Sequence, residues 1–380
     1  MSWRDWADTQ TAAIRGAGRW REPRDFDASG PEGKLAPDGR PVVSFASNDY
    51  LGLSQHPAVV AAAHAALDRW GAGSGSARLI VGSRPVHSEL EAALAEWRDT
   101  ERAVLFPTGF AANLGVLTTV ADSETFVVSD ELNHASLIDG CRLSRARVAV
   151  SRHGDADHVE TLLRGSPAPR QVVVTDTVFS MDGDVAPVQA LAEICARRGA
   201  LLILDEAHAV LGPEPALDGL EALRVGTLSK TLGALGGFVA GPSALCDLLV
   251  NRARSYIFPT ASTPADAAAA LAALGVLRSK DGEARRARLR AHVERLRPGH
   301  PAPIVPVVIG DERAALDAAA VLLEADMLVP AIRPPTVPAG TSRLRIALSA
   351  AHTTEQVHAL AVALDGLAYL VTDPGSDPGE

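Results

Sequence analysis

Short apolar runs alternate with helix-like apolar spacings along the middle of the chain. The runs at residues 125–129 and 201–205 are apolar almost throughout, which is typical of strands that are buried on both faces. Residues 57–70 and 85–99 instead place apolar side chains three or four positions apart, as on one face of a helix. This alternation predicts an α/β fold whose mostly parallel sheet is covered by helices on both faces.

The same pattern gives the extent of the elements. The predicted strands are residues 103–106, 125–129, 148–151, 171–175, 201–205 and 237–240. The predicted helices are residues 57–70, 85–99, 110–120, 135–145, 157–163, 187–198 and 243–254. The pattern breaks at about residues 259–264 and resumes with helices and the extended segments 304–309, 327–332 and 343–348.

These changes divide the chain into parts. We expect a polar N-terminal arm at 1–48, a large domain at 49–260, and a smaller C-terminal α+β domain at 261–371. The arm is rich in Gly, Pro and Arg and has no apolar core of its own. Residues 372–380 read as a tail without fixed structure.

Composition narrows the functional class. The chain has 380 residues, 47% of them hydrophobic and 4% aromatic, with a net charge of −10. An acidic balance with few aromatic side chains argues against a nucleic-acid partner. The longest apolar run, residues 267–277, is well short of the roughly 20 residues of a membrane helix. The N-terminus shows no apolar signal segment, so we expect a cytoplasmic protein without a membrane partner.

Candidate chemistry follows the ends of the predicted strands, where open α/β sheets bind their ligands. Asp205 ends the apolar run 201–205, and His208 comes three residues later. A carboxylate at such a place is seldom unpaired, because burial of a bare charge is costly. Lys230 lies among small and apolar residues, and burial there would lower its pKa and make its amine a usable nucleophile. A structural salt bridge and a surface lysine remain open alternatives on these residues alone.

Two other motifs are weaker. The glycine-rich residues 71–75 follow a predicted helix, whereas a dinucleotide fingerprint follows a strand. The letters DEAH at 205–208 also occur in a helicase family, but no phosphate-binding loop precedes them. The three cysteines, Cys141, Cys195 and Cys246, are too sparse for a zinc site or a disulfide framework, and no His and Cys cluster suggests a metal.

Four further motifs carry a family resemblance. They are FASNDYLG at 45–52, FPTGFAAN at 106–113, VFSMDGD at 178–184 and IRPPTVPAGTSRLR at 332–345. With DEAH at 205–208 and TLSK at 227–230, they resemble the α-oxoamine synthases, which are fold-type I transferases dependent on pyridoxal 5′-phosphate (PLP). The resemblance spans about four-fifths of the chain and implies a large PLP-binding domain and a smaller C-terminal domain.

The resemblance also implies roles for residues. Lys230 would bind PLP covalently and act as the base, Asp205 would pair with the pyridine nitrogen, His208 would bond the ring hydroxyl, and His134 would cover the ring. The other implied cofactor contacts are Gly109, Phe110, Ser180, Thr227 and, from a neighbouring subunit, Thr260. The implied substrate contacts are Asn48, Tyr50, Thr336 and Arg345.

The motif at 332–345 most resembles the biotin-pathway branch of the family. That branch condenses L-alanine with pimeloyl-CoA, or a pimeloyl carrier protein, to 8-amino-7-oxononanoate and releases CO2, and its members are homodimers. Another α-oxoamine synthase, such as a glycine C-acetyltransferase, is the alternative. Ala209, where a glycine is usual, and the loop at 211–216 depart from the family pattern, which leaves the acyl substrate open.

Overall fold

The computed structural model describes residues 1–217 and 219–367, so the predicted tail at 372–380 lies outside the described residues. A seven-stranded sheet forms the centre of the larger part of the molecule, with the order β4-β10-β9-β8-β7-β5-β6. Its strands are β4 (Arg102–Phe106), β5 (Thr125–Asp130), β6 (Arg147–Ser151), β7 (Arg170–Asp176), β8 (Leu201–Asp205), β9 (Ala222–Thr227) and β10 (Gly237–Gly241). Strand β10 runs antiparallel to both of its neighbours, and the pairings among β5 to β9 are parallel. The prediction of a mostly parallel sheet is therefore confirmed.

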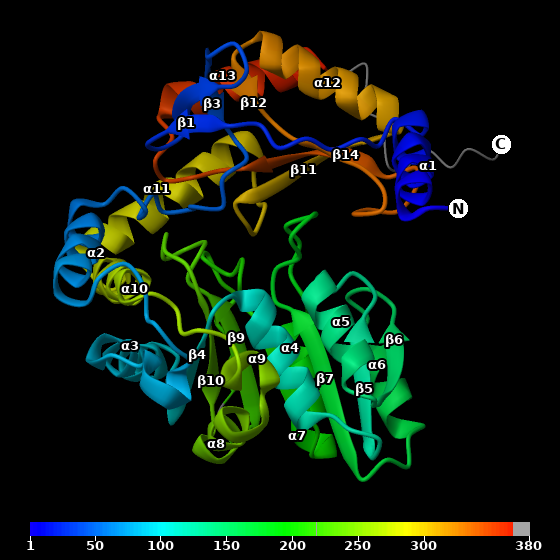
Figure 1. The fold of residues 1–380 in the computed structure, drawn as a ribbon. Helices are drawn as coiled ribbons and strands as arrows, with labels where there is room; N and C mark the ends of the chain where they lie inside the picture. The colour runs from blue at the N-terminus through cyan, green and yellow to red at the C-terminus, as the bar shows by residue number, and fades with distance from the viewer. Residues whose placement is uncertain (218, 368–380) are drawn as a thin grey trace.

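Helices cover both faces of this sheet (Figure 1). They are α2 (Pro57–Trp70), α3 (Pro85–Trp97), α4 (Gly109–Val120), α5 (Ala135–Leu143), α6 (Ala156–Arg164), α7 (Val188–Arg198), α8 (Ser243–Arg252), α9 (Arg254–Ile257) and α10 (Pro264–Leu277), together with the short π-helix Arg78–Gly82. Apolar side chains of α4, α5 and α8 pack on one face, and those of α6 and α7 pack on the other. The strands are consequently buried on both sides, which is why their sequences are apolar almost throughout.

A second, smaller part lies above the carboxyl ends of the parallel strands in Figure 1. It contains α11 (Lys280–Leu296), β11 (Ile304–Gly310), α12 (Glu312–Glu324), β12 (Met327–Leu328), β13 (Ala331–Ile332), β14 (Ser342–Ala347) and α13 (Thr354–Asp365). Strands β11, β14 and β13 form an antiparallel sheet. Helix α10 packs against α2 and α3, on the side of the larger part.

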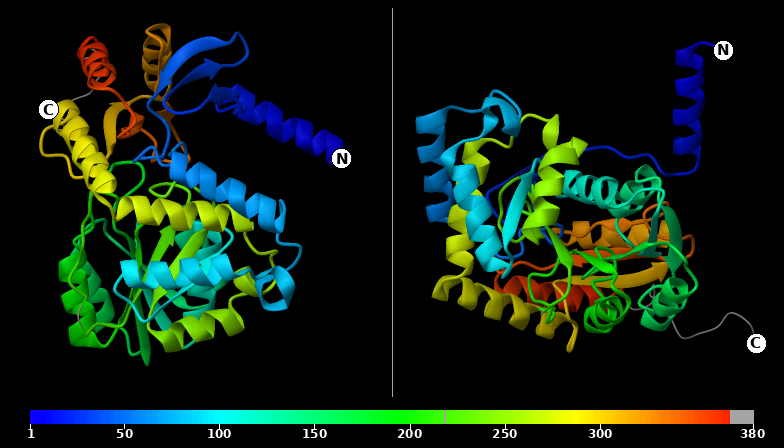
Figure 2. Two further views of the ribbon diagram at one scale, coloured as in Figure 1. Left: turned by 90° about the vertical axis from the view of Figure 1, so that its left-hand side faces the viewer. Right: turned by 90° about the horizontal axis from the view of Figure 1, so that it is seen from below.

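The N-terminal arm has structure that its sequence does not indicate. Strands β1 (Phe26–Ala28), β2 (Glu32–Leu35) and β3 (Arg40–Ser44) form a sheet with β12 of the C-terminal part. Helix α1 (Trp3–Gly16) has no buried residue, and it projects away from the rest of the molecule (Figure 2). In the part of the chain that the structure describes, no helix is long and apolar enough to cross a membrane.

Candidate active site

One cavity of about 180 Å³ lies where the parallel strands end. Strand β8 ends in Asp205, β9 ends in Thr227 just before Lys230, and β4 leads into the first turn of α4. Seven predicted site residues line this cavity together: Gly109, Phe110, His134, Asp205, His208, Thr227 and Lys230. The expectation that strand ends gather the polar residues is therefore confirmed for this edge of the sheet.

Asp205 is buried and is held by neutral donors. The Asn113 side-chain amide donates to its Oδ2 at 2.6 Å, and the Ala207 amide donates to its Oδ1 at 2.9 Å. Asn113 also donates to the Ser136 hydroxyl at 2.9 Å. No cation lies within 4 Å of this carboxylate among residues 1–217 and 219–367, so its negative charge is oriented and left available to a ligand. Asn113 was not singled out from the sequence, although it ends the quoted motif at 106–113.

Lys230 is half-buried at the opposite side of the same cavity. Burial lowers the pKa of its amine, and the charges of Asp205 and Asp176 partly offset this effect. Asp176, fully screened from water, accepts a hydrogen bond from the His134 amide at 2.7 Å, and burial together with the Asp205 charge raises its pKa well above the usual value. An amine with a lowered pKa is neutral more often near pH 7, so it can serve as a nucleophile or a base.

His208 belongs to a buried chain of polar side chains. Its Nδ1 lies 2.6 Å from the Tyr50 hydroxyl, which is also 3.1 Å from Asn48 Oδ1. Burial, followed by the charges of Lys230 and Arg345, lowers the pKa of His208 well below its usual value, so the ring is neutral. Burial raises the pKa of Tyr50 to about 12, which keeps its hydroxyl protonated.

Arg345 comes to this chain from strand β14 of the smaller part. Its Nε donates to the Ser180 carbonyl at 2.5 Å, and its Nη2 donates to Asn48 Oδ1 at 3.2 Å. Both partners are neutral oxygen atoms, and no carboxylate of the described chain lies within 4 Å of this guanidinium. The buried Arg345 therefore keeps its positive charge and several N–H groups for an anionic ligand.

The start of helix α4 forms the other end of the cavity. The first amides of a helix lack intrahelical acceptors and carry partial positive charge, and those of Gly109 and Phe110 are at this position. The Thr227 hydroxyl lies 2.8 Å from the Ser229 hydroxyl beside them. A side chain at Gly237 would place its Cβ 2.5 Å from the Gly109 nitrogen, so glycine there lets β10 approach the helix end. This arrangement is suited to a phosphate group.

Three predicted site residues lie elsewhere or act differently in this chain. Thr260 is exposed next to Ala77, with which it forms a β-bridge, and does not line the cavity. Thr336 is exposed in the loop between β13 and β14. Ser180 is half-buried, and its backbone carbonyl, not its hydroxyl, contacts Arg345.

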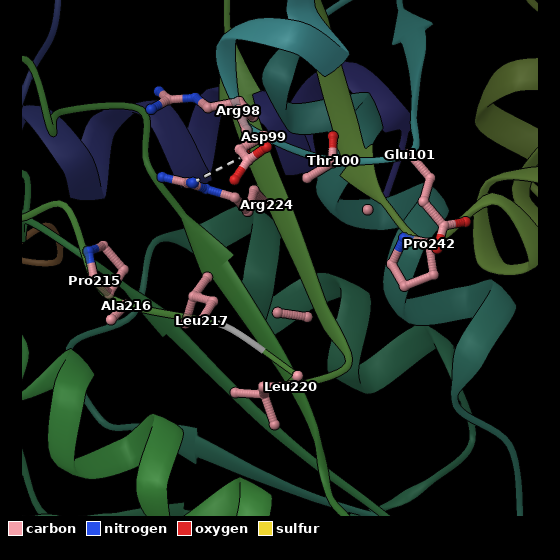
Figure 3. Close-up of a pocket in the computed structure, with 13 residues that line it drawn as sticks. Arg98, Asp99, Thr100, Glu101, Pro215, Ala216, Leu217, Leu220, Arg224 and Pro242 are labelled. Atoms are coloured by element: carbon pink, nitrogen blue, oxygen red, sulfur yellow. Dashed lines mark hydrogen bonds between the residues drawn. The ribbon is translucent and has the colours of Figure 1, made fainter.

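A second cavity, of about 570 Å³, lies at the opposite edge of the sheet (Figure 3). It is bordered by residues that precede β4 and β9 and by Pro242 after β10. Arg98 and Arg224 point the same way along its wall, and Arg224 donates to the Arg98 carbonyl at 3.2 Å. Both arginines meet the buried Glu206, with Arg224 Nε 2.9 Å and Arg98 Nε 3.3 Å from its carboxylate. Glu206, the residue after Asp205, does not line this cavity, and it compensates the charges of the two arginines.

Comparison with known proteins agrees with this geometry. The sequence model of the aminotransferase class I and II family matches residues 40–364. The 8-amino-7-oxononanoate synthase of Anaeromyxobacter dehalogenans is 49% identical over 95% of this chain and 94% of its own, and that of Burkholderia thailandensis is 48% identical over 87% and 90%.

Solved structures give the same result. Serine palmitoyltransferase from Sphingomonas wittichii superposes with a TM-score of 0.87 at 30% identity over 96% of this chain and 97% of its own. A variant of that enzyme from S. paucimobilis, solved with bound PLP, gives 0.88 at 28% identity over 96% and 97%. The 8-amino-7-oxononanoate synthase from Francisella tularensis gives 0.71 at 26% identity over 86% and 98%. The chain therefore belongs to the class I and II aminotransferase family of fold-type I enzymes and, within it, to the 8-amino-7-oxononanoate synthases.

Proposed function

We propose that this protein condenses L-alanine with a pimeloyl thioester to give 8-amino-7-oxononanoate, CO2 and the free thiol, with PLP as its cofactor. The observation that carries the proposal is the single cavity lined by Lys230 and Asp205, neither of which has a salt-bridge partner within 4 Å among the described residues. A cationic ring nitrogen is complementary to the Asp205 carboxylate, and an aldehyde is complementary to the Lys230 amine. The membership in the 8-amino-7-oxononanoate synthases supplies the substrate class.

The residues present fit PLP. Asp205 would hold the protonated pyridine nitrogen, Lys230 would bind the aldehyde carbon, and the start of α4 with Thr227 would hold the phosphate. When bound, PLP supplies an electron sink that makes the Cα proton of an attached amino acid acidic. The glycine at 237 supports this assignment, because a Cβ there would displace the Thr108 and Gly109 backbone that begins α4.

The protein's own groups would then divide the work. Arg345 would bind the α-carboxylate of alanine and fix its orientation, since a planar guanidinium with free N–H groups matches a carboxylate. Lys230 would take the Cα proton, for which its lowered pKa suits it. The neutral His208 would form a hydrogen bond with an oxygen on the ring, and His134, whose backbone amide is fixed by Asp176, would cover the ring face.

The test uses the purified holoenzyme with alanine and pimeloyl-CoA. We expect CoA release, and 8-amino-7-oxononanoate identified by mass, with much lower rates for glycine with acetyl-CoA and for serine with palmitoyl-CoA. Turnover confined to one of those other pairs would assign the chain to another α-oxoamine synthase activity. Pimeloyl carrier protein, offered at matched concentration, identifies which thioester gives the higher kcat/KM.

A homodimer forms part of this proposal. Thr260 is exposed and lies outside the cavity of its own chain, which suits a contact with the cofactor of a second copy. The exposed Trp3, Trp6 and Ile80 offer apolar surface for such a copy. Light scattering after size-exclusion chromatography should give twice the mass of 39.6 kDa. A monomer that retains full activity would contradict the shared site.

We also place the protein in the cytoplasm. All three cysteines are free and buried, and burial raises the pKa of Cys195 to about 12. Free thiols of this kind are typical of a reducing compartment. Fractionation of the cells that make this protein would locate it directly.

A further inference from the structure

A short hairpin at residues 178–185 connects the two parts of the molecule at the edge of the site. Val178 and Val185 form a β-bridge, and the Phe179 amide donates to the Asp184 carbonyl at 3.0 Å. On one side the hairpin meets the smaller part closely, since a Cβ on Gly183 would lie 2.0 Å from the Ile304 carbonyl oxygen. The position of this hairpin is therefore coupled to the position of the smaller part.

The hairpin holds both arginines of β14. The Ser180 carbonyl accepts from Arg345 Nε at 2.5 Å, and the Asp182 carboxylate forms an ion pair with Arg343. The other partners of the Arg345 side chain are the Asn48 side-chain oxygen at 3.2 Å and the Tyr50 hydroxyl. A shift of the hairpin would consequently move one of the contacts that orient the Arg345 guanidinium.

His153 anchors the hairpin to the larger part. Its Nε2 lies 2.7 Å from Asp184 Oδ2 in the hairpin, and its Nδ1 lies 3.0 Å from Asp130 Oδ1 at the end of β5. An imidazole with a carboxylate at each nitrogen can donate both bonds only when it is doubly protonated. The hydrogen bonds to Asp130 and Asp184 accordingly raise the pKa of His153 to about 10.

The surroundings strengthen this bridge. The imidazole packs edge-on against Phe179, with ring centres 4.4 Å apart, and the His153 amide donates to Glu131 Oε1 at 2.8 Å. The side chain is 26% exposed, against 9% for Asp130. His153 does not line the cofactor cavity, so it would act on the reaction through its two carboxylate partners, of which Asp184 belongs to the hairpin.

We propose that His153 is a positioning residue for the substrate carboxylate. By bridging Asp130 and Asp184 as an imidazolium, it fixes the hairpin that presents the Ser180 carbonyl to Arg345. This inference rests on the proposed function only in that Arg345 binds an α-carboxylate, a group that every α-amino acid carries.

The experiment compares amino-acid binding by wild type, His153→Gln and Asp184→Asn holoenzymes. Binding is followed by the change in cofactor absorbance as L-alanine is added, and turnover is measured with pimeloyl-CoA. For both variants we expect the Kd and KM for alanine to rise about tenfold, with kcat within about threefold and the KM for pimeloyl-CoA unchanged. Because both substitutions break the same bridge, the double variant should be no worse than His153→Gln alone.

Two matched controls test whether the effect depends on the bridge and on the carboxylate of the substrate. His158→Asn lies in the same segment, where the His158 Nδ1 accepts only from the Arg152 amide, and should leave the alanine Kd unchanged. Ethylamine lacks a carboxylate, so its affinity should be the same for wild type and His153→Gln. An unchanged alanine Kd in both bridge variants would overturn the inference, as would equal weakening of ethylamine and alanine.

The outcomes also separate this inference from the proposed function. If wild type binds no alanine but binds glycine or L-serine, the proposed substrate is wrong, and the same comparison is made with the amino acid that binds. Asp184→Asn changes the charge of residue 184 but hardly its shape, so it still tests the inference if the His153→Gln variant does not fold.

Discussion

Two consecutive carboxylates at the end of β8 treat buried charge in opposite ways. Glu206, whose side chain is 1% exposed, meets Arg98 and Arg224. At the cavity, Lys230, Asp205 and Arg345 have no oppositely charged group within 4 Å among residues 1–217 and 219–367, and neutral oxygens and amides hold the latter two. Asp205 and Glu206 are neighbours in the chain, so the difference lies in what each side chain faces.

This difference shows which cluster needs a ligand. A charge removed from water is costly unless a partner compensates it. The Arg98, Glu206 and Arg224 cluster compensates itself and therefore contributes to the folded state alone. The cluster at the cavity lacks its partners, and a bound molecule with a cationic nitrogen, an aldehyde and anionic groups would supply them. We therefore expect substitutions at the cavity to affect activity and substitutions in the Glu206 cluster to affect stability.

Removal of the Lys230 amine should have the largest effect. We expect Lys230→Ala to lower kcat by at least about 10⁴-fold, because the amine serves as both cofactor ligand and base. The melting temperature of the cofactor-free variant should equal or exceed that of cofactor-free wild type, since an unpaired, half-buried charge is lost. Steady-state kinetics and calorimetry measure the two effects. Lys280→Ala, at an exposed position that begins α11, is the matched control and should change neither quantity.

Asp205→Asn tests the same cavity with a smaller change. The Ala207 amide can still donate to the amide oxygen, and a flip of the Asn113 amide would turn its own oxygen toward the new NH2 group, so the fold should persist while the negative charge is lost. We expect kcat to fall about 10³-fold, as for loss of one aligned electrostatic contact. Kinetics and the cofactor absorbance spectrum give the result, with Asp122→Asn in an exposed turn as the control. A variant with full activity would show that the ring nitrogen needs no carboxylate.

In the Arg98, Glu206 and Arg224 cluster, Glu206→Gln should reverse the pattern. Removal of the buried carboxylate leaves the two arginines with the exposed Glu214 as their remaining carboxylate partner among the described residues, and we expect the free energy of unfolding to fall by about 3 kcal/mol. The kcat of the remaining folded enzyme should stay within a few-fold. Urea unfolding and kinetics are the measurements. Glu214→Gln, whose side chain is 72% exposed, should cost less than about 1 kcal/mol; a loss of kcat without a loss of stability would contradict the comparison.

The local pattern of apolar residues predicted most of the strands that carry the site. The strands that it missed depend on contacts between distant parts of the chain. Residues 201–205 were predicted as a strand from an apolar run, and β8 has those bounds. Strand β9 was missed because Arg224 interrupts its apolar sequence, and that arginine is explained by its ion pairs with Glu206 and Glu214. Strands β1 to β3 were missed because their sheet includes Met327–Leu328, nearly 300 residues away in sequence.

Sequence patterns likewise do not predict the individual contacts within the site. The family motifs placed Lys230, Asp205 and His208 in one site, and the structure brings them to one cavity. No motif indicates that Tyr50 would be fully buried with its hydroxyl on His208, or that Asn113 would orient Asp205. These roles depend on which face of a loop or helix turns inward, and that orientation is fixed by packing between distant segments.

His153 and its partners Asp130 and Asp184 form a third charged cluster. Its charges are paired, as in the Glu206 cluster, but it lies at the border of the site. Its folded-state pKa of about 10 lies above the usual 6.5, so its stabilising effect is complete below about pH 6.5 and is lost as the pH rises through about 10. We expect wild type to exceed His153→Gln by about 2 kcal/mol at pH 6.5, with the difference approaching zero near pH 10.5. Urea unfolding of both proteins measures this difference, in which groups common to both, such as Lys230, cancel. A difference that is equal at the two pH values would mean that packing against Phe179, and not the charge between two aspartates, holds the hairpin.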